Sequence, residues 1–365
     1  MFKLGDRNWK PFSIKDIFVT ETNGKKLQVP TGAYIHRDNL ACGNTPRITV
    51  TSLNNGIDSF CKSKHNNYRT FKNFISVSFL GTIFYHPYSA SIDMKVHCLQ
   101  LKDKSLNRYL SEFLITEIRN AIVNASYGNQ LSSTDLPHIK IILPVDKKGD
   151  PDYDFMEQFI KEREEKKRNE YIEYAKRKIS EIELTIRETN GGGVAKISYK
   201  AFAIKDIFTE CERGKRLVKE KQVIGNIPYI SSTALNNGVD SFIGNTEDIR
   251  IFKNCLSLAN SGSVGSCFYE PFEFVASDHI THLKNERFNG YHYLFIATIL
   301  NRLKEKYNFN REISDKRIGK EKVILPQKSN NIDYDFCESN IKSKIVQKYN
   351  GYISYCKDKY RVGIA

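Results

Sequence analysis

The sequence predicts an α+β protein in which one domain of short strands and helices occurs twice, each copy being followed by a long helix. Three observations support this prediction: an ordered internal repeat, turn-punctuated strand patterns within each copy, and two long charged segments whose apolar residues have helical spacing. Because the chain has 365 residues, each half is long enough to bury a hydrophobic core of its own.

The internal repeat is the strongest of these observations. Phe12–Phe18 and Phe202–Phe208 agree at six of seven positions and lie 190 residues apart. Leu53–Phe60 and Leu235–Phe242 lie 182 residues apart, so the first copy contains an insertion between the two motifs. The remaining matches keep the same order: Gly24–Leu27 with Gly214–Leu217, Phe84, Tyr85 and Pro87 with Phe268, Tyr269 and Pro271, Ile142–Pro144 with Ile324–Pro326, and Asp152–Phe155 with Asp333–Phe336.

The repeat divides the chain into four segments. Residues 1–150 and 196–330 are expected to be the two domains, and residues 151–190 and 331–362 the helices that follow them. Asn190–Gly193 contains three consecutive glycines, which favour a flexible hinge between the copies.

The front part of each copy has the pattern of short strands joined by turns. In the first copy, Phe74–Leu80 and Thr82–Tyr85 are predicted strands separated by Gly81, and Pro87 is expected to end the second. Asn-Asn-Gly at Asn54–Gly56 and at Asn236–Gly238 predicts a turn in each copy. Amphipathic helices are expected at Arg108–Val123 and Tyr291–Tyr307.

Each copy ends in a long segment with helical periodicity. Phe155–Ile186 has neither Gly nor Pro and would form a helix roughly 48 Å long at 1.5 Å per residue. Its counterpart is Asp335–Tyr360, which Gly351 is expected to interrupt. Two such amphipathic helices would pack most simply as an antiparallel pair. The part from Lys161 to Glu170 has no apolar residue and is expected to face solvent or a partner protein.

Composition restricts the class of partner. The net charge of +14 and the pI of about 9.2 favour a polyanion such as nucleic acid. The eight cysteines include no CxxC pair, so a zinc ribbon is disfavoured, and scattered thiols suit the reducing cytoplasm. We expect no signal peptide, no membrane span and no membrane partner.

Several motifs together resemble a known family. Trp9–Phe18 with the following Gly24, and the ending Ile142–Glu157, are similar to the start and end of a target-recognition domain in the specificity subunit of a restriction–modification system. The resemblance covers nearly the whole chain and leaves the choice between a type I and a type IIB-like system open. It implies two target-recognition domains joined by two long antiparallel spacer helices.

The resemblance also implies a function without chemistry of its own. Each domain would read one half of a split duplex DNA target in the major groove, and the helices would dock methyltransferase subunits, with a restriction (nuclease) subunit as a further candidate partner. The chain itself would be no enzyme and would need no cofactor, whereas S-adenosylmethionine is expected in the methyltransferase. Two copies of one reader suit the two-fold geometry of duplex half-sites.

Candidate DNA contacts fall into phosphate-binding and base-reading groups. Cations in loops after the opening motif are the expected phosphate contacts, although a solvated charged loop explains them equally well: Lys25, Lys26, Arg37, Lys215 and Arg216. Side chains beside the shared turn differ between the copies and could read different bases, although a polar strand edge is the simpler interpretation: Arg47, Thr49, Thr51 and Ser52, aligned with Tyr229, Ser231, Thr233 and Ala234.

Further polar and basic clusters complete the set of candidates. They are Lys64, His65, Asn67, Arg69, Tyr127, Asn129, Gln130, Arg250, Arg311, Lys316 and Arg317. Asn54 and Asn55 could bind adenine, but their identity in both copies favours a role in the turn.

Two other functions compete with this interpretation. Pro151-Asp152 followed by Glu164–Lys166 superficially resembles the metal site of a DNA nuclease, but the second copy lacks an equivalent. His279 and His282 are three apart, but a strand would place them on opposite faces. No phosphate loop, methyltransferase motif or nucleophile elbow occurs. The second alternative is a scaffold whose repeated domains bind proteins rather than DNA.

Overall fold

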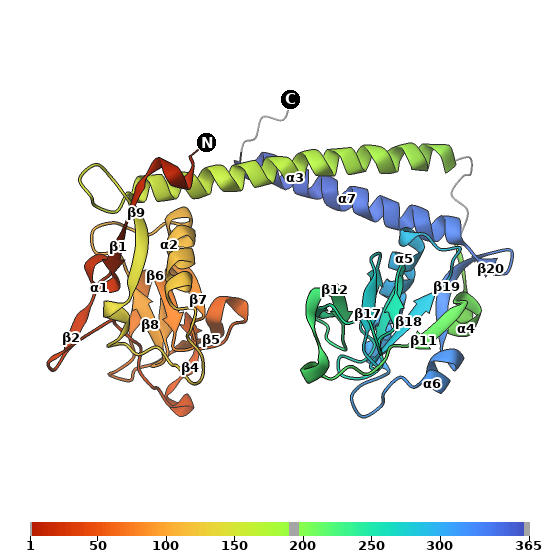
Figure 1. Ribbon diagram of the computed structural model, residues 1–365, viewed down its shortest axis with the longest axis horizontal. Coiled ribbons are helices and arrows are strands. Elements are labelled where there is room, and N and C mark those ends of the chain that lie inside the picture. The colour runs from red at the N-terminus through yellow and green to blue at the C-terminus, as the bar shows by residue number, and fades with distance from the viewer. Residues whose placement is uncertain (1, 190–196, 361–365) are drawn as a thin grey trace. The chain divides into compact units, whose positions relative to one another are not determined.

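The computed structural model describes residues 2–189 and 197–360, with side chains described outside residues 186–189 (Figure 1). The hinge predicted at Asn190–Gly193 lies outside the described residues. The chain forms two compact units that divide between Tyr171 and Ile172. Within the described ranges, none of the helices combines the length and apolarity needed to cross a membrane.

The first unit is built on a five-stranded sheet of order β5-β4-β7-β6-β8, in which only β4 and β7 run parallel. Two ribbons, β1–β9 and β2–β3, accompany it. Its strands are β1 (Asn8–Ser13), β2 (Glu21–Asn23), β3 (Lys26–Gln28), β4 (Ala41–Ile48), β5 (Ile57–Lys62), β6 (Thr70–Ser78), β7 (Ile83–Ile92), β8 (Val96–Leu99) and β9 (Lys140–Val145). Its helices are α1 (Ile14–Ile17), α2 (Arg108–Ala121), the first part of α3 (Tyr153–Thr189), and 3₁₀ turns η1 (Leu4–Asp6), η2 (Arg37–Asn39), η3 (Asn54–Gly56) and η4 (Leu136–His138).

The second unit repeats this plan with its main sheet divided in two, β11-β18-β15-β16 and β13-β12-β17-β14, beside the ribbon β10-β19-β20. Its strands are β10 (Ser198–Ala203), β11 (Glu210–Arg213), β12 (Ile224–Ile230), β13 (Val239–Ile243), β14 (Ile251–Phe252), β15 (Cys255–Ala259), β16 (Cys267–Glu270), β17 (Phe274–Ala276), β18 (Ile280–Lys284), β19 (Lys322–Lys328) and β20 (Asn331–Ile332). Its helices are α4 (Ile204–Ile207), α5 (Gly290–Leu300), α6 (Asp315–Lys320), α7 (Tyr334–Tyr360), and 3₁₀ turns η5 (Lys219–Lys221), η6 (Asn236–Gly238) and η7 (Asn301–Glu305).

Backbone pairing confirms the duplication. Phe12 of β1 pairs with Ile141 of β9, and Phe202 of β10 pairs with Val323 of β19, in the same antiparallel register. The single parallel contact is also repeated, since β4 pairs with β7 and β12 with β17. The Asn-Asn-Gly turns adopt one conformation in both units, with Asn55 at φ 56° and Asn237 at φ 53°. The predicted turn role of these asparagines is therefore confirmed.

The insertion in the first copy is the β2–β3 hairpin, and it corrects one of the matches drawn from the sequence. Gly24 lies at its tip with φ 62° and open space around it. Gly214 is instead equivalent to Gly32, because a Cβ on either residue would overlap a carbonyl oxygen, that of Ile92 at Gly32 and that of Ala276 at Gly214. Lys25 and Lys26 therefore have no counterpart in Lys215 and Arg216, although the four-residue motifs look alike.

Pro87 does not end its strand, contrary to the prediction. β7 continues through it to Ile92, because Pro87 lies at a register shift where Lys72 faces Ser89 and Phe74 faces His86. A proline at such a bulge withdraws no hydrogen bond from the ladder. In the second unit Pro271 does separate two strands, β16 and β17.

The predicted helix at Arg108–Val123 is confirmed as α2, whereas the helix at Tyr291–Tyr307 is shorter than predicted. α5 ends at Leu300 and continues as a 3₁₀ turn. The side chain of Asn301 accepts a hydrogen bond from the Cys267 amide at 3.2 Å and donates one to the Cys267 carbonyl at 2.7 Å. These two bonds tie the end of the helix to β16, and an Asn engaged in this way favours termination.

The two long helices are confirmed, and each begins at an aspartate cap. The Oδ1 atom of Asp152 accepts the Phe155 amide and that of Asp333 accepts the Phe336 amide, both at 2.9 Å. Within the second unit, the later part of α3 packs on α7 around Ile172, Ala175, Ile353 and Cys356, and the two helices run in opposite directions (Figure 1). Gly351 does not interrupt α7, contrary to the prediction.

A buried polar pair occupies the same place in both sheets but with different chemistry. Ser76 Oγ lies 2.8 Å from His86 Nε2 in the first unit, and Ser257 Oγ donates to Glu270 Oε1 at 2.9 Å in the second. Burial lowers the pKa of His86 to about 4 and raises the pKa of Glu270 to about 7. The two units thus bury groups that respond in opposite ways to pH.

Replacing Gly32 by alanine should destabilise the first unit by at least about 2 kcal/mol, because the new Cβ meets backbone that cannot move aside. Urea unfolding of the whole chain measures this effect. Gly5→Ala is the matched control, since nothing lies within 4 Å of a Cβ built there. Equal stability of the two variants would contradict the close approach at Gly32.

Glu270→Gln should remove a pH-dependent loss of stability in the second unit. The folded state holds the Glu270 proton up to about pH 7 and the unfolded state releases it near 4.5, so the free energy of unfolding falls as pH rises through this window. The loss is about 3 kcal/mol, and glutamine, which still accepts from Ser257, should abolish it. Urea titrations at pH 5 and 8, followed by hydrogen exchange of β15 and β16 peptides, measure the difference.

The matched control is His86→Gln in the first unit. His86 takes up a proton more readily when unfolded, so its contribution is present above about pH 6.5 and is lost as pH falls toward 4. Substitution there should leave the slope of the second unit unchanged. A Glu270→Gln variant as pH-sensitive as the parent chain would refute the assignment.

Candidate nucleic-acid interface

A cavity of about 880 Å³ opens beside the edge hairpin β4–β5 of the first unit. Its walls combine exposed aromatic rings, a cation and hydroxyl groups, which are the groups that contact base edges and sugar–phosphate. Its lining residues include Tyr34, Arg37, Thr49, Thr51 and Phe60, with Asp58 and Asp93 as the acidic members. We call this cavity the β4–β5 groove.

Arg47 lies beneath this groove rather than on its rim. Its side chain is 5% exposed, and its guanidinium bonds to Asp93 at 2.8 Å and to Ser91 Oγ at 3.1 Å. The equivalent Tyr229 is also buried, and its hydroxyl donates to the Leu217 carbonyl at 3.3 Å. Both residues were expected to read bases; in the structure Arg47 lines the floor of the groove and Tyr229 is buried, and both are bonded within their own unit.

Thr51 and Thr233 support the shared turn. The Oγ1 of Thr51 accepts the Leu53 amide and that of Thr233 accepts the Leu235 amide, each at 3.1 Å. The two hydroxyls therefore have the same structural role in both units. Of the expected base readers, Ser52 is exposed, and Thr49 and Ser231 are half-buried.

The basic residues of the first unit divide into exposed and engaged side chains. Lys25, Lys26, Arg37 and Lys64 are exposed, as are His65 and Asn67 in the turn after β5. Arg69 is engaged: its Nη2 lies 2.8 Å from Glu21 Oε2, and its Nη1 donates to the Thr31 carbonyl at 3.0 Å. The hydrogen bond from Arg69 lowers the pKa of Glu21. This pair ties the β2–β3 hairpin to the start of β6.

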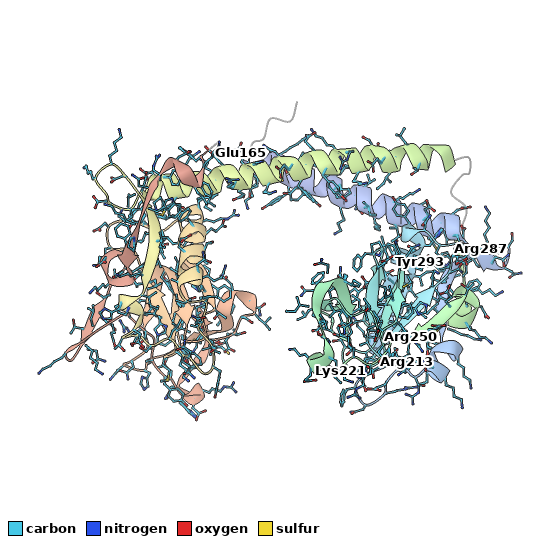
Figure 2. The ribbon with its side chains drawn as sticks, in the orientation of Figure 1. Glu165, Arg213, Lys221, Arg250, Arg287 and Tyr293 are labelled. Carbon is cyan, nitrogen blue, oxygen red and sulfur yellow. The ribbon has the colours of Figure 1, made fainter. Side chains whose placement is uncertain are left out.

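In the second unit the expected cations lie around β11 and η5. Figure 2 shows Arg213, Lys221 and Arg250 in the part of this unit that lies away from α7. Lys215 Nζ pairs with Asp248 at 2.7 Å, and Arg250 Nη1 donates to the Arg213 carbonyl at 2.6 Å. Arg216 is exposed beside them.

The segments before β9 and β19 carry the remaining candidates, and all of them are exposed: Tyr127, Asn129, Gln130 and Arg311 in loops, and Lys316 and Arg317 in α6. Arg317 Nη1 donates to the Glu312 carbonyl at 2.6 Å, which ties α6 to the loop before it. The structure therefore brings the candidates together in several separate loops of each unit and not in one cluster.

Sequence reasoning missed several exposed apolar residues. Phe60 and Phe242 are each 56% exposed at the same position, opposite Pro46 and Pro228 of the neighbouring strand. The internal repeat could have identified these two residues, because both phenylalanines belong to the matched motifs Leu53–Phe60 and Leu235–Phe242. Lys221, in η5, was also absent from the DNA contacts predicted from the sequence. Its location in a charged segment was the only sequence signal for it.

The residues proposed for a nuclease or metal site have structural roles. Asp152 caps α3 and pairs with Arg7 at 2.8 Å, and Lys166 pairs with Glu170 at 3.7 Å. His282 is buried with Nδ1 3.0 Å from the Glu212 carbonyl, and its ring stacks on Phe252. In the described ranges, no three His, Cys, Asp or Glu side chains group as metal ligands.

Comparison with known proteins agrees with this duplicated architecture. The family described as the type I restriction modification DNA specificity domain matches residues 6–174 and again residues 196–343. The specificity subunit S.BcgI of a type II restriction enzyme from Heyndrickxia coagulans is 29% identical over 261 residues, which span 68% of this chain and 71% of that protein.

One solved structure shows the same fold. The S subunit of a type I restriction–modification system from M. genitalium has a TM-score of 0.50 at 16% identity, covering 98% of this chain and 94% of that one. The HsdS subunit from Thermoanaerobacter tengcongensis, at a TM-score of 0.30 and 9% identity, covers 98% and 92% and adds nothing to the fold assignment. The two family matches together span most of the chain, which therefore belongs to the type I restriction–modification DNA specificity family and is a non-catalytic, DNA target-specificity subunit of such a system.

Proposed function

We propose that the two units read the two halves of a split duplex target, one half each. The observation that supports this most directly is that the family match occurs twice in one chain, on two units with the same strand register but different surface side chains. A repeated reader with divergent loops suits two half-sites that differ in sequence.

Within each unit we assign the contacts by exposure and pairing. Lys25, Lys26 and Lys64 in the first unit and Lys215, Arg216 and Lys221 in the second would contact phosphates. In the first unit, the β4–β5 groove, with Arg37, Thr49 and Ser52 at or beside it, would contact base edges. In the second unit Ser231 occupies the corresponding place. Arg47, Arg69 and Tyr229 are left out of this assignment because they are buried or half-buried as well as engaged within the fold, whereas Lys215 is exposed although it pairs with Asp248.

The loops before β9 and β19, together with α6, would add polar contacts. Their members are Asn129, Gln130, Arg311, Lys316 and Arg317, with His65, Asn67 and Arg250 as further contributors at neighbouring loops. All of these side chains are exposed, so they can reach a duplex without unfolding their own unit.

We also propose that α3 and α7 dock the methyltransferase subunit, which would bring S-adenosylmethionine, and that a restriction subunit joins through it in the cytoplasm. The support is that apolar residues remain exposed on helices whose facing sides are already packed, among them Leu184 and Tyr355. The stretch Lys161–Glu170 is lined by ion pairs such as Lys167–Glu170 at 3.0 Å and offers a polar rim.

The first experiment is selection of a randomised duplex library on the purified chain, with and without the methyltransferase encoded beside it. Sequencing of the retained DNA should reveal two short motifs at a fixed spacing. Replacing residues 1–150 by the equivalent domain of another specificity subunit should change one motif only. The affinity for DNA should fall steeply as the salt concentration rises, because phosphate contacts release counterions. No enrichment even with the methyltransferase present would favour the protein-binding scaffold instead.

Docking on the helices has its own test. Leu184→Glu and Tyr355→Glu should weaken capture of the methyltransferase at least tenfold in a titration of the two proteins, since a buried unpaired carboxylate opposes association. Val123→Glu, at an exposed apolar position at the end of α2, is the control and should leave capture unchanged. If the helix variants capture the methyltransferase as well as the parent chain does, the docking surface lies elsewhere.

A further inference from the structure

The first unit holds an aromatic side chain at the tip of a short hairpin after α2. Ser126 and Asn129 exchange both backbone hydrogen bonds, each 3.1 Å long, and leave Tyr127 at the turn between them. The Tyr127 side chain is 82% exposed, while the Gln130 side chain donates to its carbonyl at 3.2 Å. The backbone of the turn is therefore fixed and its ring lies in solvent.

The second unit has the same hairpin at the same place in the fold. Asn308 and Arg311 exchange both backbone hydrogen bonds at 3.3 and 2.9 Å, and Phe309 takes the place of Tyr127. The Phe309 side chain is 77% exposed. The Arg311 guanidinium lies 5.3 Å from the centre of the Tyr307 ring at the base of the hairpin.

Both hairpins are anchored to the main sheet by one equivalent hydrogen bond. The Leu131 amide donates to the Phe79 carbonyl at 2.9 Å, directly after β6. The Ile313 amide donates to the Asn260 carbonyl at 3.0 Å, directly after β15. Because β6 and β15 are equivalent strands, the two rings are presented by the same scaffold. A fixed presentation lowers the entropy cost of binding.

The ring is the feature that the two tips share. Ser-Tyr-Gly-Asn in the first unit and Asn-Phe-Asn-Arg in the second have no identical residue. Phenylalanine lacks the tyrosine hydroxyl, so the common property is the aromatic face and not a hydrogen bond. One exposed aromatic needs no explanation. Its recurrence at one position in two loops that otherwise differ indicates a task that does not depend on the sequence being read.

We propose that Tyr127 and Phe309 are wedges that insert beside a base pair of their own half-site and unstack it. Apolar side chains at loop tips distort duplexes in this way, and enzymes that modify a base must take it out of the stack. The specificity subunit would thereby open the step on which its methyltransferase acts. This inference rests on the proposed function, because it needs each unit to bind duplex DNA.

The charges around the tips fit a duplex better than a protein partner. Residues 122–134 contain no carboxylate, and residues 306–317 contain four cations against two carboxylates. A ring in such surroundings can approach the phosphate backbone without charge repulsion.

The test uses the duplex selected by the chain in the library experiment, with 2-aminopurine placed at one position after another. Its fluorescence rises when its stacking is lost. Binding of the parent chain should raise the signal at least twofold at one position in each half-site. Tyr127→Ala should abolish the rise in the first half-site only, and Phe309→Ala in the second only. Tyr127→Phe and Phe309→Tyr should retain both signals.

DNA binding is measured in the same titrations by fluorescence anisotropy. The wedge hypothesis can therefore be tested separately from the proposed recognition of half-sites. Alanine variants that bind the duplex and still raise the fluorescence overturn the wedge and leave the proposed function intact. Variants that lose capture of the methyltransferase but keep the DNA signal would show that the tips dock protein, which also overturns it. Absence of duplex binding by the parent chain with its methyltransferase overturns both. Ile142→Ala and Ile324→Ala, at equivalent exposed apolar positions in β9 and β19 away from the tips, should behave as the parent chain.

Discussion

The aspartate that joins the terminal ribbon to the long helix is the constraint on which the architecture depends. Asp152 receives its place from the ribbon, because its amide donates to the Pro144 carbonyl at 2.9 Å, and it then caps α3 through the Phe155 amide. Asp333 makes the same two bonds, to Pro326 and from Phe336. If the two units read separate half-sites, as proposed, each unit must be fixed to its own long helix. Because each aspartate is bonded both to its ribbon and to the first turn of its helix, the ribbon fixes the direction in which α3 or α7 leaves the unit.

Much of this arrangement could be predicted from the sequence, because its signals are local or repeated. Helical spacing within Phe155–Ile186 and the paired Asn-Asn-Gly turns needed no knowledge of distant contacts. The errors at Pro87 and Tyr291–Tyr307 arose where strand pairing or tertiary contacts overrode local preference, such as the side-chain bonds of Asn301 to β16. At Gly351 the packing of the neighbouring Ile353 and Cys356 on α3 favours a continuous helix.

The candidate site was harder to predict, since exposure depends on partners far away in the chain. Arg47 has a side chain of the type that reads base edges. Asp93 and Ser91, which lie 46 and 44 residues further along the chain, bond its guanidinium and hold it beneath the sheet edge. Gly24 seemed to match Gly214 because the short motifs agree, whereas the close backbone approach identifies Gly32 as the equivalent. Residue type indicated the partner, and only packing showed which side chains remain available to it.

The chain has one tryptophan, and its position gives the molecule a built-in optical probe. Trp9 lies in β1, stacks on Phe113 of α2 at 6.1 Å and donates its indole N–H to the Leu4 carbonyl at 2.9 Å. The equivalent residue in the second unit is Tyr199. Tryptophan fluorescence, excited selectively over that of tyrosine, therefore reports on the packing of the β1–β9 ribbon against α2 and α3 in the first unit alone. A change in this packing on addition of other restriction–modification subunits or DNA can be followed there without attaching a dye.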